Sequence, residues 1–220
     1  MERHFQHELE SLKTTLIKMG SVVEENFGLA LQALLDHKTA YAERVIESDN
    51  RVNSLEIEID NAIIDLLALQ QPVAGDLRFI VAAQKINNDL ERIGDHAVNI
   101  AESALTLNKD GKVETLLEIP KMASSTKSML RHALDSFILL DPKLAHSVLE
   151  TDDLVDELNR SMTAEVVDLL RSDKRNIESG LELIRISRNL ERVADMTTNI
   201  AEEVIFHTQA RVVKHHADEK

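Results

Sequence analysis

An internal repeat constrains the fold of this 220-residue chain more than any other feature. At an offset of 100 residues, segment 90–102 recurs as segment 190–202 with eight of its thirteen residues unchanged. An offset of 103 residues aligns Val45–Asp49 with Val148–Asp152. Because a repeated segment adopts a repeated supersecondary unit, the sequence predicts two similar halves. The two offsets place a connection in the second half that is three residues shorter than in the first.

The composition favours helices over strands. Only 6 residues are Gly and 3 are Pro, and aromatic residues make up 3% of the chain, whereas β-sandwiches need frequent turn residues and many aromatic side chains. Pro72, Pro120 and Pro142 lie between helical patterns, and proline is tolerated in a first helical turn because its missing N–H would have no partner there. The sequence predicts six helices, at roughly residues 3–36, 39–70, 73–107, 116–140, 143–171 and 176–212.

Apolar residues in these segments recur alternately every four and three positions, as in a coiled-coil seam. The seam is sustained over four heptads in the third helix: Phe79, Ala83, Ile86, Leu90, Ile93, Ala97, Ile100, Ala104 and Leu107. The sixth helix carries Leu183, Ile186, Leu190, Val193, Thr197, Ile200 and Val204. The second carries Val52, Leu55, Ile59, Ala62, Leu66 and Leu69. The expected fold is all-α, with two pseudo-symmetric bundles of three long antiparallel helices and domains at residues 1–110 and 111–220.

The charge balance argues against nucleic acid as a partner. There are 25 Lys and Arg residues against 39 Asp and Glu, a net charge of −14, and the sequence shows no local basic patch. A polyanion is repelled by such a field, so cations or basic protein surfaces are the expected ligands. The absence of Cys excludes disulfides and thiolate metal sites. Neither an apolar leader nor a membrane-length apolar run is present, which predicts a cytoplasmic protein.

Two pairs of acidic residues recur in the repeat. Glu91 and Asp95, like Glu191 and Asp195, are four residues apart, so each pair places two carboxylates side by side on one helix face. With Leu90 at heptad position a, Glu91 falls at b and Asp95 at f. The heptad therefore predicts that these acids lie on an outer stripe opposite the apolar seam. Like charges at this spacing destabilise a helix until a cation arrives between them.

The second helix of each half adds polar oxygen ligands at the same spacing. These are Asp49 with Asn53 in the first half and Asp152 with Asp156 in the second, flanking the seam where a neighbouring helix can share them. Four oxygen ligands from two helices suit a hard cation such as Mg²⁺, Mn²⁺ or iron.

A structural explanation of the same acids stays open. Arg92 can pair with Asp89 and Asp95, and Arg188 with Glu191, on an ordinary solvated helix face. Common ancestry of the halves is enough to preserve the pattern, so spacing alone does not establish metal binding. His96 lies next to Asp95, but its counterpart in the second half is Met196, which argues against a ligand role.

The repeated motifs resemble those of the PhoU family, the regulators of phosphate transport systems. The resemblance rests on segments 90–102 and 189–195 and on Gln71–Arg78, and it extends over essentially the whole chain. It implies two three-helix bundles, a homodimer in many members, and E/DxxxD motifs that in some members hold metal clusters, which can be multinuclear. Those motifs fall at Glu91/Asp95, Glu191/Asp195, Asp152/Asp156 and Asp49/Asn53. Asn53 departs from the pattern, since an amide replaces an acid, and the first-half site is therefore expected to bind metal more weakly.

By resemblance, the protein represses phosphate uptake and the phosphate-starvation response through contact with the ATPase of a phosphate ABC transporter and with a sensor histidine kinase. The expected function is that of a metal-binding adaptor without enzymatic activity. Two alternatives stay open: a metal-free helical scaffold, and a metal-dependent hydrolase of phosphate esters. A hydrolase needs an enclosed pocket beside the metal, which acids on an outer stripe would not provide.

Overall fold

The computed structural model describes residues 2–109, 118–172 and 177–213, and these residues form six α-helices. The prediction of an all-α protein is confirmed, and the helix ends differ from those predicted by a few residues. The predicted domain boundary, between residues 110 and 111, lies outside the described residues. None of the described helices is both long and apolar enough to cross a membrane. The helices are α1 (Glu2–Leu35), α2 (Thr39–Gln70), α3 (Ala74–Lys109), α4 (Ile119–Leu139), α5 (Pro142–Ser172) and α6 (Ile177–Gln209).

Local chemistry explains where the helices end. Helix α4 begins with Pro120 in its first turn and ends at Leu140, which is left-handed with φ 52° and donates its backbone N–H to the carbonyl of Ser136. The side chain of Asp141 then accepts the backbone N–H of Lys143 at 2.9 Å, which caps the start of α5. Pro142 occupies the first position of α5, where no N–H is needed.

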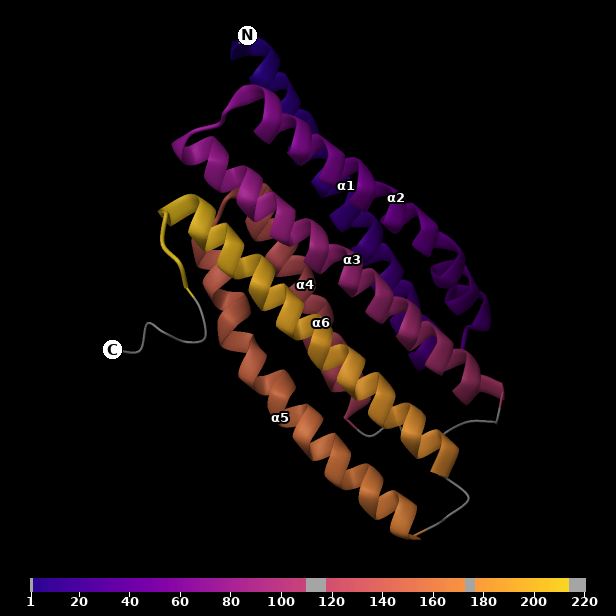
Figure 1. The fold of residues 1–220 in the computed structure, drawn as a ribbon. Helices are drawn as coiled ribbons and strands as arrows, with labels where there is room; N and C mark the ends of the chain where they lie inside the picture. Colours follow the sequence, from indigo (N-terminus) through magenta and orange to yellow (C-terminus); the bar gives the residue numbers. More distant parts are fainter. Residues whose placement is uncertain (1, 110–117, 173–176, 214–220) are drawn as a thin grey trace.

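The six helices form an elongated bundle of two three-helix units (Figure 1). Helices α1, α2 and α3 pack against one another, and so do α4, α5 and α6. The two units meet mainly where α3 lies antiparallel to α6, the most extensive contact between any two described helices, and α1 also touches α4. Within the described residues, α2 and α5 contact only helices of their own unit.

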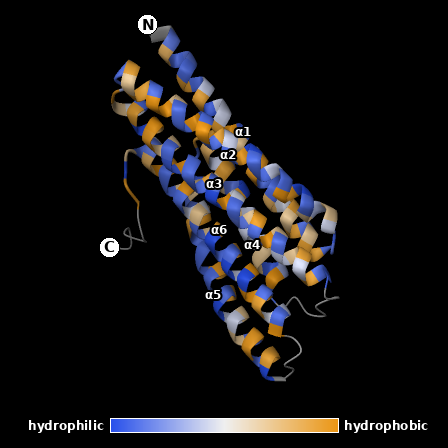
Figure 2. Ribbon diagram, turned by 45° about the vertical axis from the view of Figure 1, so that its right-hand side comes forward, coloured by the Kyte–Doolittle hydropathy of each residue, from blue (hydrophilic) through white to orange (hydrophobic). Residues whose placement is uncertain are grey.

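The predicted seams form the core. Every seam residue predicted for α3 and α6 is buried, and the buried apolar side chains of both units make one continuous cluster. Figure 2 shows the resulting alternation of hydrophobic and hydrophilic positions along each helix. One prediction for α2 is wrong: Leu69 is 73% exposed. It lies in the last turn of α2, where the chain turns away through the left-handed Gln71.

Helices α3 and α6 are also buried along a second line of residues, which the apolar pattern of the sequence does not predict. This line occupies heptad position g, next to the seam, and faces the partner helix across the centre of the molecule. Many of its residues are polar, yet they are buried or half-buried because each of the two helices is enclosed by three neighbours. The members are Ala82, Asp89, His96 and Ser103 on α3, and Glu182, Asn189, Met196 and Glu203 on α6.

Hydrogen bonds and an ion pair across this interface satisfy several of the buried polar groups. A ring nitrogen of His96 (Nδ1) lies 2.7 Å from the amide oxygen of Asn189. Lys85 Nζ donates to Glu203 Oε1 at 2.6 Å. Because buried polar groups must be paired, these contacts fix the register of α3 against α6.

Among the buried acids of this interface, Asp89 has the most strongly shifted pKa. Burial raises the pKa of its carboxyl from 3.8 to about 6, while a hydrogen bond from Asn199 and the charge of Arg92 oppose the shift. The equivalent residue in α6 is the neutral Asn189. The interface therefore holds one acid whose charged form is disfavoured in the folded state.

We expect Asp89→Asn to become progressively more stable than the natural protein as the pH rises from about 4 to about 6. A raised folded-state pKa means that the natural carboxyl supports folding only at low pH, and this support is lost as the pH rises through the folded-state value. Asn does not titrate, so the difference should level off above about pH 7. Urea unfolding at a series of pH values measures it, with the exposed Asp153→Asn as control. A difference in unfolding free energy that does not change with pH would contradict the raised pKa of Asp89.

Candidate metal centre

Acidic residues of the second half meet where α5 packs against α6. One carboxylate oxygen each from Asp156, Glu191 and Asp195 lies within 4.8 Å of the other two, and all three side chains are half-buried. Within the described ranges, no other group of three His, Asp or Glu side chains meets this spacing. The structure thus brings together three of the four ligands predicted for this half.

The fourth predicted ligand, Asp152, lies one turn earlier on α5 and is half-buried. Together with Asp195 it lines a cavity of ≈ 560 Å³ between α5 and α6, to which Arg92 of α3 also contributes.

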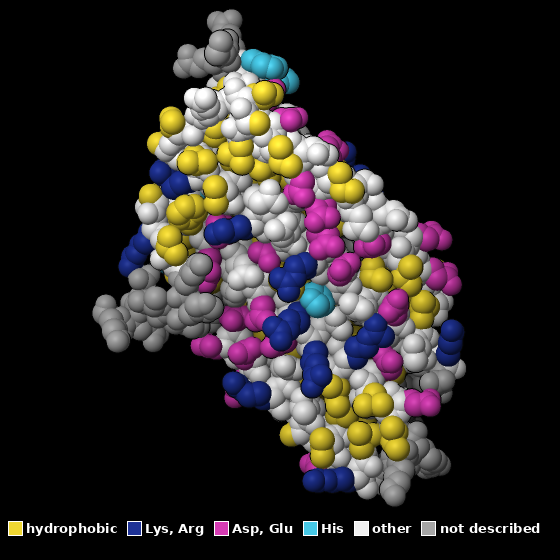
Figure 3. All heavy atoms as spheres, viewed as in Figure 1, with side chains coloured by type: hydrophobic (Ala, Val, Ile, Leu, Met, Phe, Trp, Pro, Cys, Tyr) yellow, Lys and Arg dark blue, Asp and Glu magenta, His cyan; other side chains and the backbone are white. Residues whose placement is uncertain are grey.

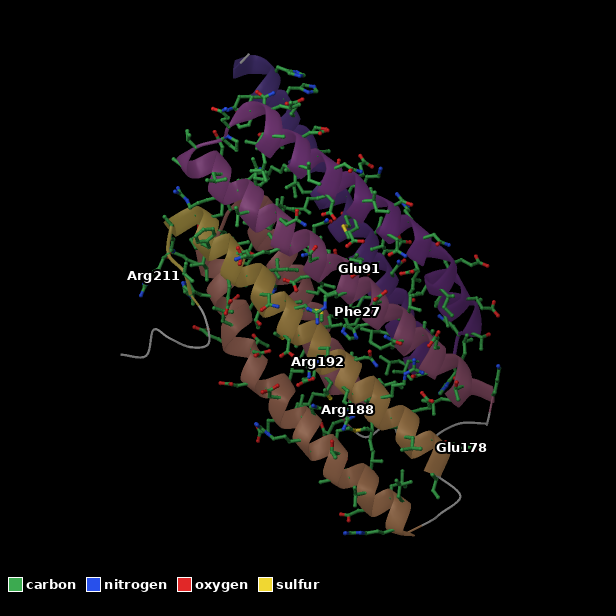
Figure 4. All side chains as sticks on the ribbon, viewed as in Figure 1. Phe27, Glu91, Glu178, Arg188, Arg192 and Arg211 are labelled. Carbon is green, nitrogen blue, oxygen red and sulfur yellow. The ribbon has the colours of Figure 1, made fainter. Side chains whose placement is uncertain are left out.

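In the first half the corresponding residues lie where α2 packs against α3. The side-chain amide of Asn53 donates to Asp49 Oδ2 at 3.0 Å, so these two α2 residues form one polar unit. The charge of Asp49 raises the pKa of both Glu91 and Asp95, which places it close to the α3 pair. Glu91, labelled in Figure 4, lies on α3 beside α2.

The structure adds one acid that the sequence analysis missed. Glu56 of α2 interacts electrostatically with Glu91 and Asp95, and it lies seven residues after Asp49 on the same helix face. Spacing of i, i+4 and i+7 from Asp49 through Asn53 to Glu56 is the signal that would have found it.

Glu56 changes the comparison between the two halves. At the offset of 103, Asn53 corresponds to Asp156 and Glu56 corresponds to Asn159, so each second helix carries two acids and one amide. Asn159 is engaged as an acceptor by the Ser187 hydroxyl at 2.6 Å. The expectation of weaker binding in the first half therefore no longer follows from the charge count. It follows instead from geometry, because the close triad of carboxylates occurs in the second half.

Burial and mutual repulsion raise the pKa values of the motif acids in both halves. Burial is the largest cause for Glu91, Asp95, Glu191 and Asp195 alike. The next cause for Glu91 is the charge of Asp95, and for Glu191 that of Asp195. For Asp195 the charge of Arg192 opposes the shift and that of Asp156 reinforces it. Such clusters bind a proton or a cation more readily than isolated carboxylates do.

The prediction that these acids form an outer stripe is wrong in part. Asp95 is exposed, but Glu91, Glu191 and Asp195 are half-buried. The heptad assigned them to the solvent side because it considers one seam only. In the bundle, α2 and α5 cover that side of α3 and α6, so the acids lie in grooves between helices.

The donor set fits a hard cation. Mg²⁺ and similar ions bind carboxylate oxygens at about 2.1 Å, which places ligand oxygens on opposite sides of the ion about 4.2 Å apart. The 4.8 Å limit of the second-half triad is therefore within a small side-chain adjustment of a binding geometry. Oxygen ligands alone favour Mg²⁺, Mn²⁺ or iron. His96 is directed elsewhere, to Asn189 of α6.

Comparison with known proteins identifies the family. The PhoU domain matches the chain twice, at residues 16–104 and 119–204. The chain belongs to the PhoU family. It is 40% identical to the "Phosphate-specific transport system accessory protein PhoU homolog" of Aquifex aeolicus, over 97% of each chain. The crystal structure of PhoU from Pseudomonas aeruginosa superposes with a TM-score of 0.92 at 36% identity, covering 94% of this chain and all of that one. The crystal structure of the phosphate transport system regulatory protein PhoU from Streptococcus pneumoniae superposes with a TM-score of 0.87 at 30% identity. It covers 96% of this chain and all of that one.

Each of the two PhoU matches contains one acidic cluster. Residues 16–104 include the α2–α3 cluster, and residues 119–204 include the α5–α6 cluster. The two clusters therefore occupy equivalent places in the two repeats of this PhoU-family chain.

The expectation that the chain has no local basic patch is wrong. Arg92 and Arg192 line the cavity beside Asp195, and Arg185, Arg188 and Arg192 line an adjoining cavity of ≈ 380 Å³. Figure 3 shows Lys and Arg side chains gathered around a histidine in the middle of the face that carries α3 and α6. The patch combines Arg92 of the first repeat with Arg185, Arg188 and Arg192, which lie within eight residues of one another on α6. This spacing of three arginines is the signal that the sequence analysis missed.

We expect Asp95→Asn and Asp195→Asn to leave the metal-free fold intact, with changes in unfolding free energy within about ±0.5 kcal/mol at pH 7. Asp95→Asn should be the more favourable of the two. It relieves repulsion from Asp49 and Glu91, whereas Asp195→Asn also loses the ion pair with Arg192 at 3.1 Å. The raised pKa values mean that any gain should grow as the pH rises above the ordinary aspartate range. Urea unfolding of chelator-treated protein provides the measurement. If either variant fails to fold without metal, these acids are packing elements.

Proposed function

We propose that this PhoU-family chain is a regulatory accessory protein of a phosphate-specific transport system, which represses phosphate uptake and the phosphate-starvation response. Relatives that match nearly the whole of this chain carry that accessory name. The observation that carries the proposal is the pair of acidic clusters at equivalent positions in the two repeats. They give a PhoU-family fold a means of responding to cations.

The proposed metal is a hard ion, Mg²⁺, Mn²⁺ or iron, in each cluster, and the number of carboxylates allows more than one ion. Asp49, Asn53, Glu56, Glu91 and Asp95 would hold it in the first half. Asp152, Asp156, Glu191 and Asp195 would hold it in the second. A bound cation supplies the positive charge that offsets the repulsion among these acids, and so links α2 to α3 and α5 to α6.

The proposed partners are the ATPase of a phosphate ABC transporter and a phosphate-sensing histidine kinase, joined by a homodimeric cytoplasmic adaptor. A net charge of −14 favours basic partner surfaces. Contact with the membrane would then be peripheral and pass through these partners.

The adaptor function is preferred to a hydrolase, although the structure removes one argument against catalysis. Asp152 and Asp195 line a cavity, contrary to the expectation of open, outward-facing acids. Among the described residues lining that cavity there is no His or Lys to serve as a general base or acid beside the carboxylates. Relatives are named accessory proteins. A metal-free scaffold is the remaining alternative, and metal titration distinguishes it.

Mn²⁺ or iron should raise the melting temperature of chelator-treated protein. Binding to the native state alone adds about 2.7 kcal/mol of stability at a hundredfold excess over Kd. Differential scanning calorimetry with and without each ion tests this. Identical melting temperatures with every ion would favour the metal-free scaffold.

Variants in each half identify the sites. Asp195→Asn should weaken metal binding in the second half and Asp95→Asn in the first, as measured by isothermal titration calorimetry. The second-half site should bind more tightly because its carboxylates already lie close together. The exposed Asp153→Asn, on the same helix as Asp156, serves as control and should bind metal as the natural protein does.

We expect no direct DNA binding at physiological ionic strength, whatever the effect on transcription. The net charge repels a polyanion, and the arginines of the basic patch are interspersed with Asp152, Asp195 and Glu202. Fluorescence anisotropy with labelled duplexes measures it. Saturable binding that salt reverses would contradict this expectation.

A further inference from the structure

The basic patch at the centre of the molecule is unexpected in a chain with a net charge of −14. Its residues are Arg92 of α3 and Arg185, Arg188 and Arg192 of α6, with His96 beside them. Figure 3 shows this group on the face that carries α3 and α6, and Figure 4 labels Arg188 and Arg192 one turn apart on α6. In a molecule with so many acids, a concentration of cations needs an explanation.

The arginines line two adjoining cavities that share Arg192. The larger, ≈ 560 Å³, is also lined by Arg92, Thr198 and Asn199. The smaller, ≈ 380 Å³, is also lined by Arg188 and His96. The larger cavity is lined by three acids as well, Asp152, Asp195 and Glu202. Among the described residues no acid lines the smaller cavity, where guanidinium groups lie beside an imidazole and an amide that can complete a hydrogen-bonding set.

Internal ion pairs use only part of this positive charge. Arg185 is engaged by Glu102 at 2.8 Å and by Asn99 at 2.9 Å, which accounts for its place at the α3–α6 interface. Arg192 contacts Asp195 at 3.1 Å and Glu191 at 3.6 Å.

Arg92 and Arg188 are the less engaged members. The nearest carboxylate oxygen to Arg92 is that of Asp89, at 4.0 Å. Arg188 makes no ion pair or hydrogen bond with any residue that the structure describes. Each guanidinium carries five N–H donors in a planar fork, and most of these remain available here.

We propose that Arg92, Arg188 and Arg192 form a binding site for a phosphate group, either inorganic phosphate or a phosphomonoester. Guanidinium forks bind the oxygens of such an anion in pairs. A compact anion can bind at the smaller cavity, which no described acid lines, whereas an extended polyanion would also meet Asp152, Asp195 and Glu202. Nucleic acid is disfavoured further because no Phe, Tyr or Trp among the described residues lines either cavity for base stacking. Arg192 also contacts Asp195 and Glu191, two of the proposed metal ligands, so the site is tested in metal-free protein.

Isothermal titration of chelator-treated full-length protein with inorganic phosphate tests the site. Arg188→Gln and Arg92→Gln should each weaken binding by about tenfold or more, the effect of losing one charge-assisted hydrogen bond. The phosphate affinity of Arg188→Lys should lie between those of the natural protein and Arg188→Gln, because lysine keeps the charge but lacks the planar guanidinium group. Arg131→Gln, at an exposed position of α4, is the matched control and should bind as the natural protein does. Circular dichroism checks that each variant is folded.

A second titration, with a phosphoserine peptide, distinguishes the two sources of the anion. Tighter binding of inorganic phosphate would assign the site to the free ion, and tighter binding of the peptide would assign it to a phosphorylated partner. The proposal is overturned if neither ligand binds, or if the arginine variants bind phosphate as well as Arg131→Gln does. It is also overturned if the arginine variants lose binding to DNA but not to phosphate. Because the charges of Arg188 and Arg92 act on Glu191 and Asp195, metal binding by the same variants is measured separately with Mn²⁺.

Discussion

The antiparallel contact between α3 and α6 is the constraint on which the rest of the structure depends. It joins two three-helix units that each bury their own apolar seam, and it does so through a line of polar and small residues rather than a second apolar stripe. His96 with Asn189 and Lys85 with Glu203 are paired across it. Unpaired polar groups would be costly at this depth, so the pairing specifies one register between the units. Burial raises the pKa of Asp89 in this interface, so the charged form of its carboxyl is disfavoured in the folded state.

The same two helices carry the functional groups, because each is enclosed on several sides. One side of α3 faces α1, another faces α2 and a third faces α6. The acids lie in the grooves toward α2 and α5, where partial burial raises their pKa values. The arginines lie at the central contact, where the two repeats come together. The acids and the arginines meet at Asp195 and Arg192, which form an ion pair at 3.1 Å and line the same cavity. This PhoU-family chain therefore brings its acidic clusters and its basic patch together along one pair of helices.

The two repeats are equivalent in architecture and different in chemistry. The amide and the second acid exchange places between α2 and α5, so that Asn53 and Glu56 correspond to Asp156 and Asn159. The total of acids is preserved, but only the second half has three carboxylates already close together among the described residues. The basic patch is asymmetric as well, since Arg188 corresponds to Asn88. Duplication followed by such exchanges yields two acidic clusters with different arrangements of carboxylates on one scaffold.

The sequence by itself determined the all-α class, the six helices, the pseudo-symmetry and the apolar seams, because helix periodicity and repetition are local properties that a linear pattern records. It also gave the ExxxD pairs, since i,i+4 neighbours share a face in any helix. Only the tertiary structure decided which sides of α3 and α6 are covered. It therefore decided that Glu91 and Asp195 are half-buried, that Glu56 joins the first cluster, and that arginines from both repeats meet. A heptad describes one seam of one helix, whereas burial and electrostatics depend on every helix packed around it.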